Sequence, residues 1–169
     1  MIDLGPFQAT LRGAKLLVLD VDGVLTDGRL FYGAQGEQLK VFHVRDGYGI
    51  KQVGDAGIGV AIISGRKSTA VLRRARDLGI KHVFQGVDDK LAALKKLAKA
   101  RRVTLEACVC VGDDTPDAPI LSVCGLGVAV ADAHPDALAA ADLVTTHTGG
   151  QGAVREVCDW LMAARAGAK

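Results

Sequence analysis

The chain has 169 residues, a length that suits one ordinary domain with a single hydrophobic core. Hydrophobic residues make up 49% of the chain and charged residues 24%, proportions that exclude a disordered chain and a membrane-embedded one. The formal net charge is +2 and the 21 Lys and Arg residues are scattered in short clusters at helical spacing, so we expect no nucleic-acid partner.

The sequence shows no targeting segment and no internal boundary. Residues 1–13 lack the basic start and long apolar run of a signal peptide, and no stretch reaches the length of a membrane span. We therefore expect a cytoplasmic protein without membrane contacts. No linker, low-complexity segment or internal repeat divides the sequence, which predicts one domain over residues 1–169.

Short apolar runs alternate with helical patterns from one end of the chain to the other. Strands are expected at residues 15–19, 58–63, 82–84, 107–111, 127–130 and 143–144. Helices are expected at residues 47–56, 68–78, 90–100, 117–123, 135–140 and 153–164. This alternation predicts an α/β fold with right-handed crossovers and a doubly wound parallel sheet, whose ligands bind beyond the carboxyl ends of the strands.

Residues 29–44 break this alternation. Apolar residues flank a Gly-rich turn at residues 33–36, and Leu39, Val41 and His43 occupy every second position after it. This pattern predicts a β-hairpin that protrudes from the main sheet. No insertion is long enough to form a cap domain, so a cover over any site must come from the hairpin, the C-terminus or another subunit.

Two acidic residues follow the first expected strand. Asp20 and Asp22, within the segment Asp20–Asp27, place two carboxylates at the carboxyl edge of the sheet, where a cation between them would offset their repulsion. An Asp and Gly pair after a strand can also simply make a turn, and this motif alone leaves the two interpretations even.

A second acidic segment, Gly112–Asp117, follows the expected strand at residues 107–111. Carboxylate oxygens from two strand ends form the kind of oxygen-only ligand set that Mg²⁺ prefers. Asp117 also suits the start of a helix, and the two roles are compatible because different acids can serve different purposes.

Two further polar residues stand at element ends. Ser64 and Gly65 follow the expected strand at residues 58–63, where a hydroxyl and backbone amides can donate to phosphoryl oxygens, although such residues are also ordinary caps. Lys90 begins an expected helix, where a cation opposes the helix dipole unless it faces an anion.

Cysteine and the other histidines indicate no metal or redox site. The four cysteines contain no CxxC pair, and two of them lie in an apolar run, so they are interpreted as small core residues. Three histidines have no partner at ligand spacing and are interpreted as structural or exposed; they are His82, His134 and His147.

Taken in chain order, Asp-x-Asp, serine, lysine and Gly-Asp-Asp resemble the four motifs of the haloacid dehalogenase superfamily of phosphatases. The resemblance covers nearly the whole chain and implies that superfamily's Rossmann-like fold with Mg²⁺ as cofactor. It implies Asp20 as nucleophile and Asp22 as general acid and base, with Ser64 and Lys90 holding phosphoryl oxygens. It also implies Mg²⁺ ligands from the Asp20 carboxylate, the Asp22 backbone carbonyl and Asp113, supported by Asp114 or Asp117.

Within this superfamily the chain resembles the capless family of 3-deoxy-D-manno-octulosonate 8-phosphate phosphatases. The resemblance rests on the hairpin, the missing cap and residues 26–28, 42–49 and 149–156. It implies a homotetramer that hydrolyses a phosphorylated sugar acid in lipopolysaccharide biosynthesis. His43 departs from the Asn often present in that family, and the segment after Trp160 is shorter than the family's tail.

The same resemblance implies the residues that contact the sugar acid. Arg66 and Arg74 are expected to bind its carboxylate or phosphate, although an exposed helical position explains Arg74 equally well. Lys51 is expected to face the substrate across a subunit boundary. Together with Asp22 and Lys90, the remaining expected contacts are His43, Val44, Arg45, Asp46 and Gly47.

Two other functions remain open at this stage. The first is a phosphatase for a nonulosonate 9-phosphate, because the sequence specifies the phosphoryl chemistry more closely than the sugar pocket. The second is a non-catalytic phosphoacceptor or binding module, because a doubly wound sheet with an Asp at a strand end also occurs in signalling domains. Asp22 argues against the second, since a phosphoacceptor has no use for an acid that protonates a leaving group.

Overall fold

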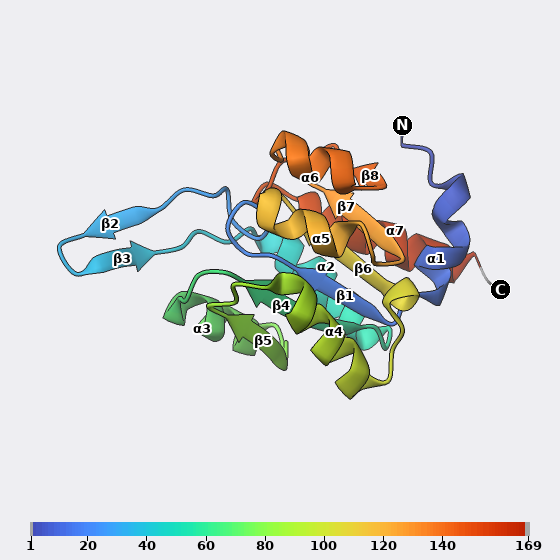
Figure 1. The fold of residues 1–169 in the computed structure, drawn as a ribbon, viewed down its shortest axis with the longest axis horizontal. Coiled ribbons are helices and arrows are strands. Elements are labelled where there is room, and N and C mark those ends of the chain that lie inside the picture. The colour runs from blue at the N-terminus through green and yellow to red at the C-terminus, as the bar shows by residue number, and fades with distance from the viewer. Residues whose placement is uncertain (1, 168–169) are drawn as a thin grey trace.

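A computed structural model describes residues 2–167 and shows a parallel six-stranded sheet between two layers of helices (Figure 1). The strand order is β5-β4-β1-β6-β7-β8, so β1 lies inside the sheet with β4 and β6 as neighbours. The strands are β1 (Leu16–Leu19), β4 (Gly59–Ser64), β5 (His82–Gln85), β6 (Cys108–Gly112), β7 (Leu126–Ala129) and β8 (Leu143–Val144). The expected α/β fold with a doubly wound parallel sheet is therefore confirmed.

Helices α1 (Gln8–Gly13), α2 (Val44–Asp55) and α7 (Ala153–Ala166) pack against one another on one face of the sheet. Helix α3 (Thr69–Asp77) borders α2, with Leu78 close to Gly47. The opposite face carries α4 (Lys90–Arg101), α5 (Ala118–Leu121) and α6 (Pro135–Ala140) (Figure 1). Short 3-10 helices are η1 (Gly5–Phe7), η2 (Leu105–Ala107) and η3 (Thr115–Asp117). No helix within residues 2–167 combines the length and apolar character needed to cross a membrane.

The core consists of aliphatic side chains, as the strand patterns indicate. All four residues of β1 are fully buried, because strands inside a parallel sheet are covered on both faces. Cys108, Cys110 and Cys158 lie in the core and Cys124 at its margin, in agreement with their interpretation as packing residues. Burial raises the pKa of the Cys108 thiol to about 11, which keeps it protonated at neutral pH.

The hairpin forms a separate two-stranded antiparallel sheet that projects away from the body (Figure 1). Its strands are β2 (Phe31–Gly33) and β3 (Gly36–Leu39). A register shift follows Phe31, so Phe31 pairs with Leu39 and Tyr32 pairs with Glu37. Phe31 and Leu39 are exposed, while Tyr32 and Glu37 both contact Arg66.

The second half of the hairpin differs from its expected extent. The strand pattern through His43 predicted a strand to residue 44, but β3 ends at Leu39 and Val44 already begins α2. The first turn of α2 was missed because the alternation of Leu39, Val41 and His43 continued the strand pattern up to that point. Gly49 is required by packing, since a Cβ there would lie 2.9 Å from the Cβ of Cys158 in α7. Helix α1 was not predicted from the sequence at all.

Candidate active site

The topology of the sheet brings the predicted site residues to one edge. Asp20 follows β1, Ser64 ends β4 and Asp113 follows β6, and these three strands are neighbours with carboxyl ends on the same side. Lys90 begins α4 and reaches Asp20 from there. Asp20, Ser64 and Lys90 are all buried, so this edge is a compact polar centre.

Three carboxylates converge in this centre. Asp20, Asp113 and Asp117 each offer an oxygen, and these oxygens lie within 4.8 Å of one another. One oxygen of Asp113 is buried without a hydrogen-bond partner among the described residues. An oxygen-only set with an unsatisfied acceptor fits a hard divalent cation such as Mg²⁺.

The crowding of these acids changes their protonation equilibria. Burial, followed by repulsion from Asp20 and Asp117, raises the pKa of Asp113 to about 8. Burial and repulsion from Asp117 raise the pKa of Asp20 to about 6, although Lys90 opposes this shift. Ionising all three acids is therefore unfavourable without an added positive charge.

Lys90 supplies part of that charge and is held in place by Asp117. Its Nζ lies 2.9 Å from Asp20 Oδ1 and 2.6 Å from Asp117 Oδ1. Burial alone would lower the pKa of Lys90, but the two carboxylates raise it. The lysine thus remains a cation beside Asp20.

Asp117 and Asp114 have different positions, which the sequence left open. Asp117 is buried, and its second oxygen accepts hydrogen bonds from the backbone amides of Asp113 at 3.2 Å and Asp114 at 3.3 Å. Asp114 is exposed and accepts from the amide of Thr115 at 2.7 Å. Asp117 therefore shapes the Asp113 loop, whereas Asp114 caps η3.

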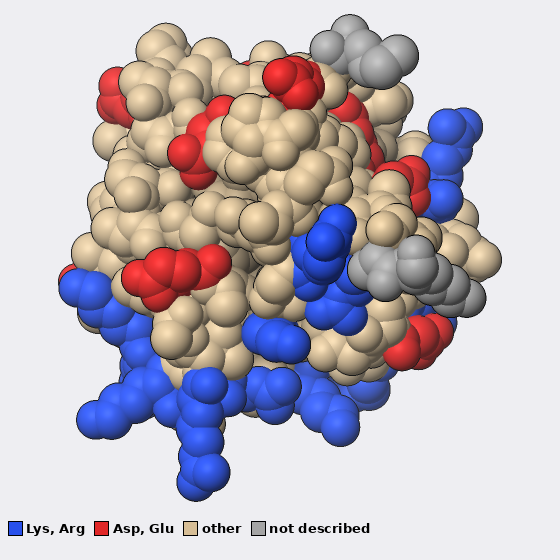
Figure 2. All heavy atoms as spheres, turned by 90° about the vertical axis from the view of Figure 1, so that its right-hand side faces the viewer, with Lys and Arg blue, Asp and Glu red and all other residues tan. Residues whose placement is uncertain are grey.

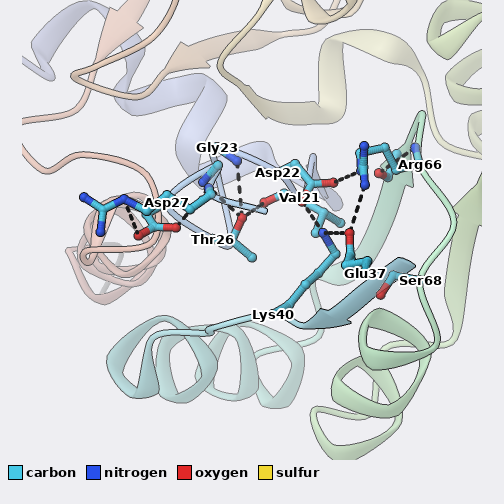
Figure 3. Close-up of polar contacts among 12 residues, drawn as sticks. Val21, Asp22, Gly23, Thr26, Asp27, Glu37, Lys40, Arg66 and Ser68 are labelled. Carbon is cyan, nitrogen blue, oxygen red and sulfur yellow. Dashed lines mark hydrogen bonds and ion pairs between the residues drawn. The ribbon is translucent and has the colours of Figure 1, made fainter. Parts of the chain in front are cut away.

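The loop after β1 depends on glycine. Gly23 has φ +96°, and a Cβ there would overlap the carboxylate of Asp113. The hydroxyl of Thr26 donates to the carbonyl of Val21 at 3.3 Å and accepts from the amide of Gly23 at 3.4 Å (Figure 3). The loop can thus fold tightly over Asp113.

Two further glycines, Gly149 and Gly150, pack against the same loop. The amide of Gly150 donates to the carbonyl of Val24 at 2.9 Å, and a Cβ on Gly149 would overlap the carbonyl of Gly23. The turn before α7 therefore packs its backbone directly against the loop that follows Asp20.

The carboxylate of Asp22 points toward Lys40 and Arg66 (Figure 3). It contacts Nζ of Lys40, which also lies 3.2 Å from Glu37 Oε2. Arg66 completes the group: its Nη2 donates to Glu37 at 2.9 Å and its Nε lies 3.5 Å from Asp22 Oδ2. We call Asp22, Glu37, Lys40 and Arg66 the hairpin ion cluster.

Glu37 and Lys40 were not identified from the sequence. The only signal was two charged residues in the second half of the hairpin, which is also typical of an exposed edge strand. The side chain of Lys40 is only 2% exposed, because it lies against Asp22 and Glu37.

The residues expected to contact a sugar acid lie in several different environments. Val44 and Arg45 are exposed at the start of α2. His43 precedes them, and its carbonyl lies 3.5 Å from Nη2 of Arg74. Arg74 is partly buried against Gly47, so it is not the freely exposed helical residue of the alternative interpretation.

Asp46 and Lys51 lie apart from these contacts. The buried Asp46 accepts a hydrogen bond from the amide of Arg155 at 2.8 Å, which anchors the first turn of α7. Lys51 lines a groove of about 680 Å³ at the opposite edge of the sheet, together with Arg76 and Arg101. Figure 2 views the molecule from the right-hand side of Figure 1 and shows many Lys and Arg side chains gathered along the lower part of that face. Within this chain Lys51 does not join the acidic centre.

The chain is similar to known hydrolases and phosphatases. Residues 83–157 match the model of a family described as haloacid dehalogenase-like hydrolase. The chain is 50% identical over 158 residues to 3-deoxy-D-manno-octulosonate 8-phosphate phosphatase KdsC of Escherichia coli strain B, covering 94% of this chain and 84% of that protein. It is 51% identical over 151 residues to the Salmonella typhi protein of the same name, covering 89% and 80%.

The structure is also similar to solved structures of phosphatases. The chain superposes with TM-score 0.94 and 41% identity on the Moraxella catarrhalis 3-deoxy-D-manno-octulosonate 8-phosphate phosphatase in complex with magnesium ion, phosphate ion and KDO, covering 97% of this chain and 94% of that one. The cobalt-bound Haemophilus influenzae phosphatase gives TM-score 0.90 and 47% identity, covering 93% and 92%. Similarity therefore extends over nearly the whole chain.

Proposed function

The chain belongs to the family of 3-deoxy-D-manno-octulosonate 8-phosphate phosphatases among the haloacid dehalogenase-like hydrolases, and we propose that it hydrolyses this sugar phosphate with Mg²⁺ as cofactor. The observation that carries the proposal is the meeting of Asp20, Asp113, Asp117 and Lys90 at one sheet edge, in a chain about half identical to these phosphatases. The products are the free sugar acid and phosphate, and we place the reaction in lipopolysaccharide biosynthesis.

The reaction has two steps. In the first, a carboxylate oxygen of Asp20 bonds to phosphorus while the bond from phosphorus to the sugar oxygen breaks, and Asp22 gives a proton to that oxygen. In the second, Asp22 takes a proton from a water molecule whose oxygen attacks phosphorus. Phosphate leaves and the Asp20 carboxylate is restored.

The cation would be held by carboxylates of Asp20 and Asp113 and by the backbone carbonyl of Asp22. When bound, Mg²⁺ supplies positive charge to the phosphoryl oxygens and to the crowded acids. Lys90 offsets the charge of Asp20 and faces the same phosphoryl group. Ser64, buried at the end of β4, offers its hydroxyl to a further oxygen.

The sugar acid would lie between the acidic centre and the hairpin. Arg66 is the first candidate for its carboxylate, because a guanidinium group suits planar anions and its side chain is 40% exposed. Arg74 supports the segment that carries His43. The other contacts proposed on family grounds are Val44, Arg45, Asp46, Gly47 and Lys51, the last from a neighbouring subunit.

A homotetramer in the cytoplasm is also part of the proposal. Apolar side chains that are 42–80% exposed gather on the hairpin and at the start of α2, namely Leu30, Phe31, Tyr32, Leu39, Val41, Val44 and Tyr48. Exposed apolar patches of this kind mark protein interfaces. Light scattering should give the mass of four chains for the wild type and a smaller mass for a Phe31→Ser, Val44→Ser variant.

The deciding experiment measures phosphate release from 3-deoxy-D-manno-octulosonate 8-phosphate with and without Mg²⁺. A nonulosonate 9-phosphate is tested beside it, and Asp20→Asn serves as the control. Metal-dependent and Asp20-dependent release from the first substrate alone supports the proposal. Preference for the second substrate would keep the chemistry and change the substrate. No release from either, with stable phosphorylation of Asp20, would favour a phosphoacceptor module.

A further inference from the structure

We infer that Glu37 limits the affinity for the sugar acid, because its carboxylate holds Arg66 until the carboxylate of a sugar acid replaces it. The inference rests on the proposed function, because it takes Arg66 as the residue that receives the substrate's carboxylate. It concerns a residue of the hairpin, outside the four sequence motifs.

The register of the hairpin directs Glu37 to Arg66. Tyr32 and Glu37 are directly paired across the two strands, so their side chains share one face. Nη2 of Arg66 lies 3.3 Å from the Tyr32 hydroxyl and 2.9 Å from Glu37 Oε2. Both strands of the hairpin thus contact the same guanidinium group.

Glu37 occupies the position on Arg66 that a substrate carboxylate would take. Burial alone would raise its pKa, but hydrogen bonds from Arg66, Lys40 and Ser68 lower it, so the group is ionised at neutral pH. Its side chain is 15% exposed and makes two charge-assisted contacts, with Arg66 and with Lys40 at 3.2 Å. A monoanionic carboxylate from solution offers Arg66 the same charge and the same planar geometry.

Exchange of one carboxylate for another affects only phosphate esters that carry a carboxylate. A sugar acid must displace Glu37 before it can form the same ion pair with Arg66, so part of its binding free energy is lost to this competition. A phosphate ester without a carboxylate leaves Glu37 on Arg66 and loses nothing. Glu37 therefore weakens binding of the sugar acid relative to an ester without a carboxylate.

The test compares wild type with Glu37→Gln on two substrates, 3-deoxy-D-manno-octulosonate 8-phosphate and the carboxylate-free p-nitrophenyl phosphate. The measured quantity is the ratio of kcat/KM for the sugar acid to kcat/KM for p-nitrophenyl phosphate. Removing the competing charge should raise this ratio about three- to tenfold, through a lower KM for the sugar acid. Glu106→Gln, a neutralisation at an exposed remote position, should leave the ratio unchanged.

A lower ratio in Glu37→Gln would overturn the inference, because it would make Glu37 a residue that orients Arg66 for the substrate. An unchanged ratio would overturn it as well. Glu37→Asp keeps the charge but shortens the side chain, so it should give an intermediate ratio even if the Gln variant folds poorly. Failure of the wild type to release phosphate from the sugar acid would instead refute the proposed function.

Discussion

Lys40, at the base of the hairpin, contacts the carboxylate of Asp22 in the loop after β1, although 18 residues separate them in the sequence. The contact is shielded from solvent, since the side chain of Lys40 is 2% exposed and that of Asp22 is 17% exposed. Asp22 is thereby tied to the hairpin while Asp20, two residues earlier, faces Lys90 and the acidic centre. The two acids of the motif consequently belong to different electrostatic environments.

The first prediction concerns this contact. Lys40→Gln should lower kcat about tenfold, because Asp22 loses the cation that positions it for proton transfer, a step that contributes about 10²- to 10⁴-fold to such reactions. Steady-state kinetics with the sugar phosphate measures the change. Lys95→Gln on the exposed face of α4 is the matched control and should behave as wild type. Equal kcat values for Lys40→Gln and wild type would show that the contact has no role in turnover.

The second prediction concerns the nucleophile. Asp20→Asn should reduce phosphate release by about 10³-fold or more, because an amide cannot form the aspartyl-phosphate. The fold should persist, since removing one of three crowded acids relieves repulsion. Far-ultraviolet circular dichroism checks the fold, and Asp114→Asn, an exposed acid outside the centre, provides the comparison. Substantial turnover by Asp20→Asn would refute the assignment of the nucleophile.

The third prediction concerns pH and metal. The pKa of Asp113 is raised to about 8, so in the folded protein this group binds a proton that the unfolded chain releases near pH 4. Its contribution to stability is therefore complete below pH 4 and is lost as pH rises toward 8. In EDTA, Asp113→Asn should have a higher Tm than wild type, by a margin that grows between pH 5 and 8.

Mg²⁺ should reverse this difference. The wild type should gain Tm as the cation is added, because binding to the folded state alone stabilises it, and Asp113→Asn should gain much less. Differential scanning calorimetry at several Mg²⁺ concentrations measures both effects. A wild-type protein whose Tm does not respond to Mg²⁺ would argue against a cation at this acidic centre.

The fourth prediction concerns the buried lysine. Lys90→Met should lower the free energy of unfolding by about 3–5 kcal/mol, because it leaves Asp20 and Asp117 buried without their cation. Adding Asp117→Asn to this variant should recover part of the loss, since the two partners contact each other. Urea unfolding of the four proteins in this double-mutant cycle measures the coupling. Strictly additive effects would contradict a direct interaction.

The fifth prediction concerns Gly23, which packs against the carboxylate of Asp113. Gly23→Ala should weaken Mg²⁺ binding and stability, because its methyl group would displace the Asp113 carboxylate. Gly57→Ala isolates the backbone cost, since Gly57 also has positive φ, +82°, but open space around its Cβ position. Gly57→Ala should lose only about 1 kcal/mol of stability and keep its metal affinity. Similar metal affinities for both variants would refute the clash.

The sequence predicted the strands well because apolar runs in a buried parallel sheet leave little ambiguity. Five of the six differ from the structure by one residue at one or both ends, and β8 agrees at both ends. Helices were harder at their ends, as the missed first turn of α2 shows, because the residues before Gly47 alternate like a strand and nothing local marks the start of the helix.

The acidic centre was also predictable, since each of its members stands at a strand end or helix start. The hairpin ion cluster was not. Lys40 and Glu37 meet Asp22 only because the hairpin folds back over the loop after β1, a tertiary arrangement with no local signature. The role of Asp117 as the partner of Lys90 likewise depends on the distance between α4 and η3 in space.

The loop after Asp20 is tightly packed on two sides, which restricts where this chain could accept inserted residues. Residues 23–27 pack tightly between the Asp113 carboxylate and the backbone of Gly149 and Gly150. An insertion there would therefore displace Asp20, the proposed nucleophile. The exposed turn of the hairpin, residues 33–36, has no such neighbours on its outer side. A grafted recognition module would therefore be tolerated at the hairpin tip and nowhere within the tightly packed loop, which makes this hairpin the natural site for redesigning substrate choice.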